Sequence, residues 1–147
     1  MSKFYALSPA SAIDDLIEAI KYDVLADEEV MWLHLARVRA GQDDRQEFEN
    51  NSNSLLSGKW PAPLVALYRD KGTVEDVFAK AKIGEASDQV DQLCGANFYT
   101  AEWYLTKNMG AKAKHLFQVA KDTCPKVDPE GMFARSELAA LDKNIQH

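Results

Sequence analysis

The sequence predicts an all-α protein of about eight helices arranged as antiparallel pairs. Apolar residues recur at three- and four-residue spacing through most of the chain, which is typical of helices with one buried face. Gly, Pro and Asn interrupt this pattern at short intervals, and short loops force consecutive helices to run antiparallel. Apolar and polar residues show almost no strict alternation, so no segment is predicted to form a strand.

The N-terminal third of the chain is predicted to contain three helices. The first runs from Ser8 to about Leu25, because Ser8 can cap it and Pro9 suits its first position. The second begins at Asp27 and stops at Gly41, a residue type that favours the left-handed backbone after a helix. A more polar helix follows within residues 42–56.

The middle of the chain is predicted to form two short helices and a long one. Residues 60–63 begin a helix that ends before Gly72, and Thr73 is expected to cap the next. After a connector at 84–87, the longest helix begins at Ser87 or Asp88 and continues to about residue 108.

Two further helices are predicted at Gly110–Cys124 and Pro129–Ile145. Asn108 and Gly110 are expected to supply the left-handed backbone of the turn before them. In the last helix the inward side chains are predicted to be Met132, Phe133, Leu138 and Leu141. The outward side chains are predicted to be Glu130, Arg135, Glu137 and Lys143.

Composition limits the classes of function. The length suggests one domain over residues 1–147, and the net charge of −6 argues against nucleic-acid binding. No apolar run is long enough to span a membrane. The N-terminus is not a signal peptide as written, so the sequence predicts a cytoplasmic protein, or a periplasmic one if a leader was removed. The excess of acidic residues in the first 60 positions fits either a basic partner or simple solubility.

Residues 94–127 resemble a tetratricopeptide repeat that begins at Cys94. Small residues stand where the two helices of the repeat approach closely, large rings fill the gap between them, and a proline ends the repeat. These residues are Ala101, Tyr104, Ala113, Phe117, Ala120 and Pro125. Upstream, Trp32 and Leu35 reproduce the opening of the same pattern, followed by degenerate repeats. The resemblance implies a right-handed superhelix of helix pairs, a tetratricopeptide-like α-solenoid, with residues 128–147 as its capping helix.

A longer series of motifs is similar to one bacterial family of tetratricopeptide proteins, the new-lipoprotein-I-like family. The motifs are Trp32–Arg37, Trp60–Pro63, Cys94–Tyr99, Leu116–Pro125 and Ala134–Leu138. The resemblance implies a helical adaptor that dimerises and scaffolds hydrolases and proteases of the cell envelope.

Partner binding is expected on the first helix of each pair, which lines the inner face of such repeats. The candidate contact residues are Leu33, Arg37, Phe98, Glu102, Leu105 and Thr106. Phe98 and Leu105 have an alternative interpretation, because apolar residues at helical spacing usually belong to the core.

Cys94 and Cys124 occupy the first and thirty-first positions of the repeat, which meet at one end of a helical hairpin. A disulfide is compatible with this placement if the Cα atoms lie within about 7 Å. Two free, buried thiols in a reducing compartment are equally compatible.

No catalytic, metal or cofactor site is predicted. His34, His115 and His147 share no metal-ligand spacing, and His34 is interpreted as a structural residue near Trp32. Asp43 and Asp44 are interpreted as ordinary solvated helix-face or capping residues rather than catalytic carboxylates. The leading hypothesis is therefore a non-enzymatic adaptor that binds a protein or peptide.

Two alternatives remain open. One is a small enzyme or ligand-binding domain with a pocket between Trp32, Trp60 and Trp103. The other is a homodimer formed through exposed rings of the terminal helices.

Overall fold

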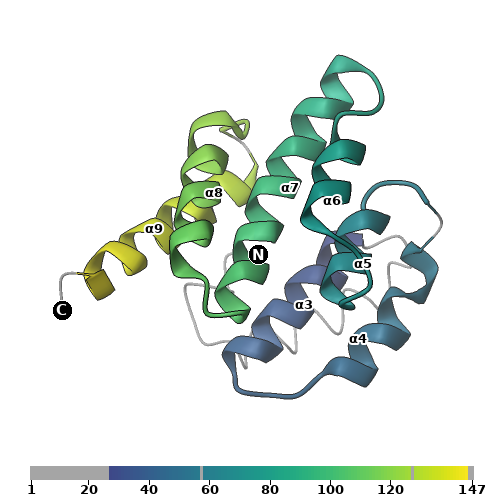
Figure 1. Ribbon diagram of the computed structural model, residues 1–147, viewed down its shortest axis with the longest axis horizontal. Coiled ribbons are helices and arrows are strands. Elements are labelled where there is room, and N and C mark those ends of the chain that lie inside the picture. Colours follow the sequence, from purple (N-terminus) through teal and green to yellow (C-terminus); the bar gives the residue numbers. More distant parts are fainter. Residues whose placement is uncertain (1–26, 57, 127, 146–147) are drawn as a thin grey trace. The chain divides into compact units, whose positions relative to one another are not determined.

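The computed structural model describes residues 27–56, 58–126 and 128–145 (Figure 1). These residues form seven α-helices and one 3-10 helix, and none of them lies in a strand. The prediction of an all-α chain is confirmed for this part of the sequence. The predicted helix at Ser8–Leu25 lies outside the described residues.

The chain divides into two compact units, Met1–Val65 and Ala66–His147. The described part of the first unit contains α3 (Asp27–Arg39), α4 (Arg45–Ser52) and η1 (Asn53–Leu55). Helix α5 (Ala62–Tyr68) crosses the boundary. The second unit continues with α6 (Val74–Ala81), α7 (Ala86–Thr106), α8 (Gly110–Thr123) and α9 (Pro129–Ile145).

In the first unit, α3 and α4 are joined by a polar contact under the loop between them. Nδ1 of His34 lies 2.9 Å from both carboxylate oxygens of Asp44, and the His34 ring centroid lies 4.5 Å from that of Phe48. Asp44 occupies the N-cap position of α4 but is only 5% exposed, so the prediction that it is solvated is wrong. The chain reverses at Gly41 (φ +77°), which brings the carboxylate back to the imidazole.

In the second unit, side-chain caps fix the starts of α6 and α7. Oγ1 of Thr73 accepts a hydrogen bond from the backbone N–H of Asp76, as predicted from the sequence. Helix α7 is capped by Glu85 and begins at Ala86 rather than at Ser87 or Asp88. The side chain of Asp88 accepts from the backbone N–H of Glu85, and the Glu85 side chain accepts in return from the backbone of Asp88. This reciprocal pair starts the helix earlier than expected.

Helices α7 and α8 form an antiparallel hairpin (Figure 1). Asn108 adopts the predicted left-handed backbone (φ 59°), whereas Gly110 does not and instead begins α8. Phe98 and Phe117 are fully buried, with ring centroids 6.0 Å apart.

The predicted inward face of α9 is confirmed in part, because Leu141 is half-buried and Arg135 is exposed as expected, whereas three other residues differ. Glu130 and Glu137 are each 5% exposed, whereas Met132 is 60% exposed. Phe133 and Leu138 are buried as expected. The prediction for Glu130 and Glu137 is wrong because residue type alone places a carboxyl in solvent, whereas a buried carboxyl is tolerated where hydrogen-bond partners meet it.

None of the helices in the described ranges combines the length and apolar character required to cross a bilayer.

Candidate functional site

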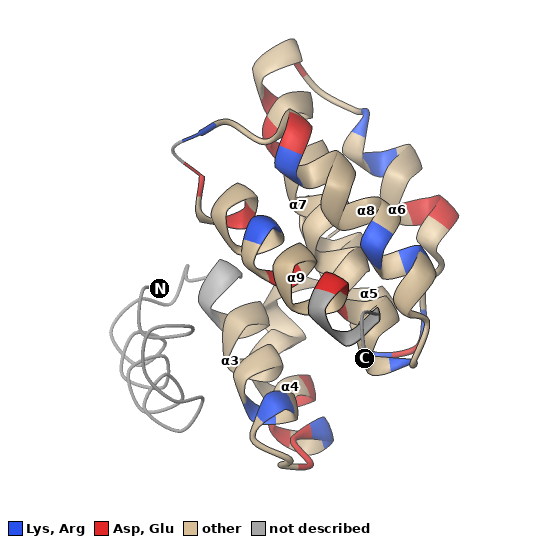
Figure 2. Ribbon diagram, turned by 90° about the vertical axis from the view of Figure 1, so that its left-hand side faces the viewer, with Lys and Arg blue, Asp and Glu red and all other residues tan. Residues whose placement is uncertain are grey.

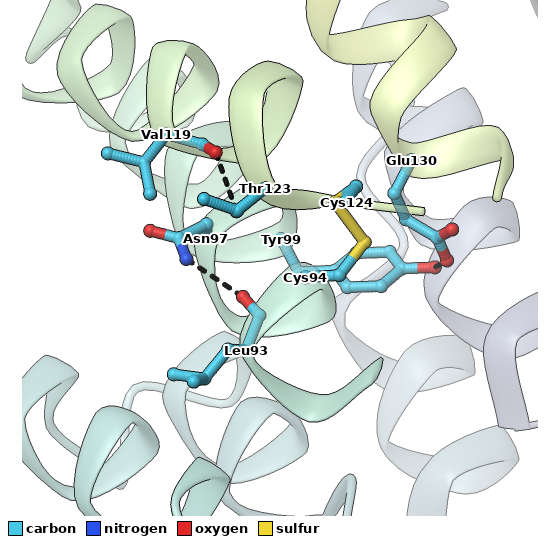
Figure 3. Close-up of a disulfide and its surroundings, with 8 residues drawn as sticks. All are labelled: Leu93, Cys94, Asn97, Tyr99, Val119, Thr123, Cys124 and Glu130. Carbon is cyan, nitrogen blue, oxygen red and sulfur yellow. Dashed lines mark hydrogen bonds between the residues drawn. A yellow bond between two sulfur atoms is a disulfide. The ribbon is translucent and has the colours of Figure 1, made fainter. Parts of the chain in front are cut away.

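The first feature of interest is a disulfide that closes the open end of the α7–α8 hairpin (Figure 3). Cys94 lies within α7, and Cys124 is the residue that ends α8. Their Cα atoms are 4.9 Å apart and their sulfur atoms are bonded. Of the two states compatible with the sequence, the structure contains the disulfide, which links the two helices covalently.

The first turn of α9 packs against this disulfide. The hydroxyl of Tyr99 donates a hydrogen bond to Oε1 of Glu130 at 3.4 Å, and Figure 3 shows the Tyr99 ring reaching past the disulfide towards that carboxyl. A Cβ atom on Gly131 would lie 3.2 Å from Cβ of Cys124. A residue without a side chain therefore allows the close approach of α9.

Acidic groups collect around the same point. Burial raises the pKa of Glu130, with further increases from the negative charges of Asp128 and Asp91. The Glu130 backbone N–H and the Tyr99 hydroxyl lower it in part. The pKa of Asp128 is also raised, by desolvation and by repulsion from Asp91. Within the described part of the chain, no ion pair involves any of these three carboxyls.

The second feature is an open groove of about 620 Å³ between α8 and α9. Its charged lining residues are three basic and two acidic ones, on a chain that is acidic as a whole. They are Lys114, Lys121, Asp122, Arg135 and Asp142. Figure 2 shows both signs of charge along these helices. Gln118, Leu138 and Ala139 complete the lining.

Only part of the charge in this groove is paired. Nζ of Lys114 lies 3.0 Å from Oδ1 of Asp142, so this pair connects α8 with α9. Lys121 and Arg135 make no ion pair with any described residue. Each of these two cationic groups can bind a carboxylate of another molecule, and the planar guanidinium of Arg135 can donate two hydrogen bonds to it.

The six predicted contact residues differ in exposure. Leu33, Phe98 and Glu102 are each no more than 2% exposed. Arg37 and Leu105 are half-buried and Thr106 is exposed, with its hydroxyl donating to the carbonyl of Trp103. Exposed surface therefore remains on three of the six, and their role in partner binding stays a prediction.

The predicted repeat positions lie mostly in the core. Five of them have no exposed surface: Trp32, Ala101, Ala113, Phe117 and Ala120. Tyr104 and Pro125 are half-buried, with Pro125 directly after the disulfide. The three alanines allow α7 and α8 to approach closely, since a larger side chain at these positions would have no space.

The three tryptophans of the alternative pocket belong to different units of the chain. Trp32 and Trp60 belong to the first unit and Trp103 to the second, so that alternative stays a prediction.

The sequence did not indicate Glu130, Lys121 and Arg135 as residues of a functional site. The pairing of α8 with α9 brings the last two to one groove, and no local motif indicates this.

Comparison of the chain with protein-family models, with curated proteins and with solved structures finds no match. The tetratricopeptide resemblance therefore rests on the repeat residues themselves.

Proposed function

We propose that this protein is a non-enzymatic helical adaptor of the tetratricopeptide type, which binds a segment of another protein. The main support is the groove between α8 and α9, where Lys121 and Arg135 face solvent without an ion-pair partner in the described chain. The close-packed α7–α8 hairpin gives that groove a rigid wall, because its alanine positions are fully buried.

The charges of the groove favour a partner segment that carries Asp or Glu. Lys114 is already neutralised by Asp142, so Lys121 and Arg135 are the groups available to a carboxylate. The apolar part of the lining, Leu138 with Ala139, would contact the uncharged side chains of the same segment. Charge complementarity of this kind governs partner choice and association rate.

A selection from a random peptide library, displayed on phage and applied to the native protein, tests this function. Selected peptides should be enriched in acidic residues. The charge-reversal double variant Lys121→Glu with Arg135→Glu should bind them at least tenfold more weakly, a loss of about 1.4 kcal/mol. The matched control is Lys71→Glu with Lys82→Glu, two exposed lysines outside the groove, which should retain the affinity.

Failure to select any peptide, or equal affinity of the two double variants, would contradict the proposal. Sedimentation of the native protein over a range of concentrations measures self-association in parallel. A dimer dissociated by the groove variant alone would identify the partner as a second copy of the chain.

A further inference from the structure

The side chains around the disulfide also have the composition of a metal site. One ligand atom from each of Cys94, Asp128 and Glu130 lies within 4.8 Å of the other two. The fourth candidate is Cys124, whose sulfur is bonded to that of Cys94. Cysteine thiolates and Asp or Glu carboxylates are both among the ligands that Zn²⁺ takes in four-coordinate sites.

We propose that reduction of the Cys94–Cys124 disulfide converts this cluster into a binding site for a thiophilic divalent cation such as Zn²⁺. The four ligands would be the two thiolates and the carboxylates of Asp128 and Glu130. This inference is independent of the groove between α8 and α9.

Electrostatics supports a cation at this position. Glu130 and Cys94 are buried, and no described residue forms an ion pair with Asp91, Asp128 or Glu130. A dication bound between the carboxylates of Asp128 and Glu130 would offset the negative charge that these residues and Asp91 bring to this point. Tyr99 would orient the Glu130 carboxyl from outside the ligand set through its hydroxyl, as outer partners of ligating carboxylates do.

The chemistry requires a reductant of the dithiol class, which is oxidised to its own disulfide while the Cys94–Cys124 bond opens to two thiols. Binding of Zn²⁺ then forms two Zn–S bonds and releases the two thiol protons to solvent. A carboxyl that is protonated beforehand releases its proton as well. The oxidised protein has no thiolate to offer and should bind the ion weakly through carboxylates alone.

The experiment uses the full chain, reduced with a phosphine that is then removed under anaerobic conditions. Titration with Co²⁺ should produce the thiolate-to-cobalt charge-transfer band at one ion per chain, and Zn²⁺ should displace it. Glu130→Gln, which keeps an acceptor for Tyr99, should weaken Zn²⁺ binding by at least about tenfold, and Asp128→Asn should also weaken it. The control Asp122→Asn removes an exposed carboxylate close to Cys124 and should bind like the wild type.

Far-ultraviolet circular dichroism accompanies each titration, because the reduced chain could lose its helices. In that case Zn²⁺ should restore them in the wild type and not in the double variant Asp128→Asn with Glu130→Gln. The proposal is overturned if the reduced wild type binds no Zn²⁺, if the carboxamide variants bind it as tightly as the wild type, or if the oxidised protein binds it equally well.

Discussion

The hydroxyl of Tyr99, in the middle of α7, donates a hydrogen bond to the Glu130 carboxylate in the first turn of α9. The two residues are 31 positions apart in sequence. Their contact holds a buried acidic group beside the Cys94–Cys124 disulfide, where burial and neighbouring carboxylates raise its pKa. Several measurable properties of the second unit depend on this arrangement.

The first prediction concerns pH. Because the pKa of Glu130 is higher in the folded chain than its ordinary value of 4.5, the folded state holds this proton more tightly than the unfolded state. Its contribution to stability is therefore complete below the ordinary value and is lost as the pH rises through the folded pKa. Asp128 contributes with the same sign.

Urea unfolding of the oxidised protein at several pH values between about 4 and 8 measures this effect. The free energy of unfolding of the wild type, relative to Glu130→Gln, should decrease as the pH rises. A difference between the two proteins that is constant over this range would rule out a raised pKa for Glu130.

The second prediction concerns the disulfide. It closes a loop of 30 residues, so its removal should lower the free energy of unfolding by on the order of 3 kcal/mol. The double variant Cys94→Ala with Cys124→Ala is compared with the oxidised wild type by urea unfolding. A chelator is present throughout, so that metal bound to thiols makes no contribution. Equal stability of the oxidised protein and the double variant would contradict a native disulfide.

The third prediction tests the close approach of α7 and α8. Ala120 is fully buried, and a leucine at this position would overpack the interface and cost about 1–3 kcal/mol of stability. The control Ala111→Leu places the same side chain on the exposed face of α8 and should change stability by less than about 0.5 kcal/mol. Thermal unfolding compares the two variants. Equal effects would mean that the hairpin interface is not close-packed.

Local signals predicted much of the fold. The hydroxyl cap at Thr73, the left-handed residue Asn108 and the start of α9 at Pro129 all follow from the chemistry of single positions, and the structure contains each of them. The burial of the alanines of α7 and α8 was expected from the resemblance to a tetratricopeptide repeat. These features were accessible because each depends on a few neighbouring residues.

The parts that were missed depend on residues distant in sequence. Glu130 was assigned to solvent because its partner, Tyr99, belongs to another helix. Asp44 was misassigned for the same reason, since its contact with His34 forms only after the chain reverses at Gly41. The groove between α8 and α9 likewise requires the pairing of two helices, which helical spacing alone does not determine.

The last prediction concerns the first unit, where His34 and Asp44 are in contact under the α3–α4 loop. A hydrogen bond to a charged, buried carboxylate contributes about 1.5–3 kcal/mol, so the double-mutant cycle of His34→Ala and Asp44→Ala should give a coupling energy of this size. The matched cycle of His34→Ala with Asp43→Ala should give almost none, because Asp43 is exposed and, within the described ranges, its side chain accepts from the backbone N–H of Arg45 rather than contacting His34. Chemical denaturation supplies all of the free energies. If the two cycles agreed, the loss of stability in Asp44→Ala would have to come from the loop itself, and the imidazole–carboxylate contact could not be what joins α3 to α4.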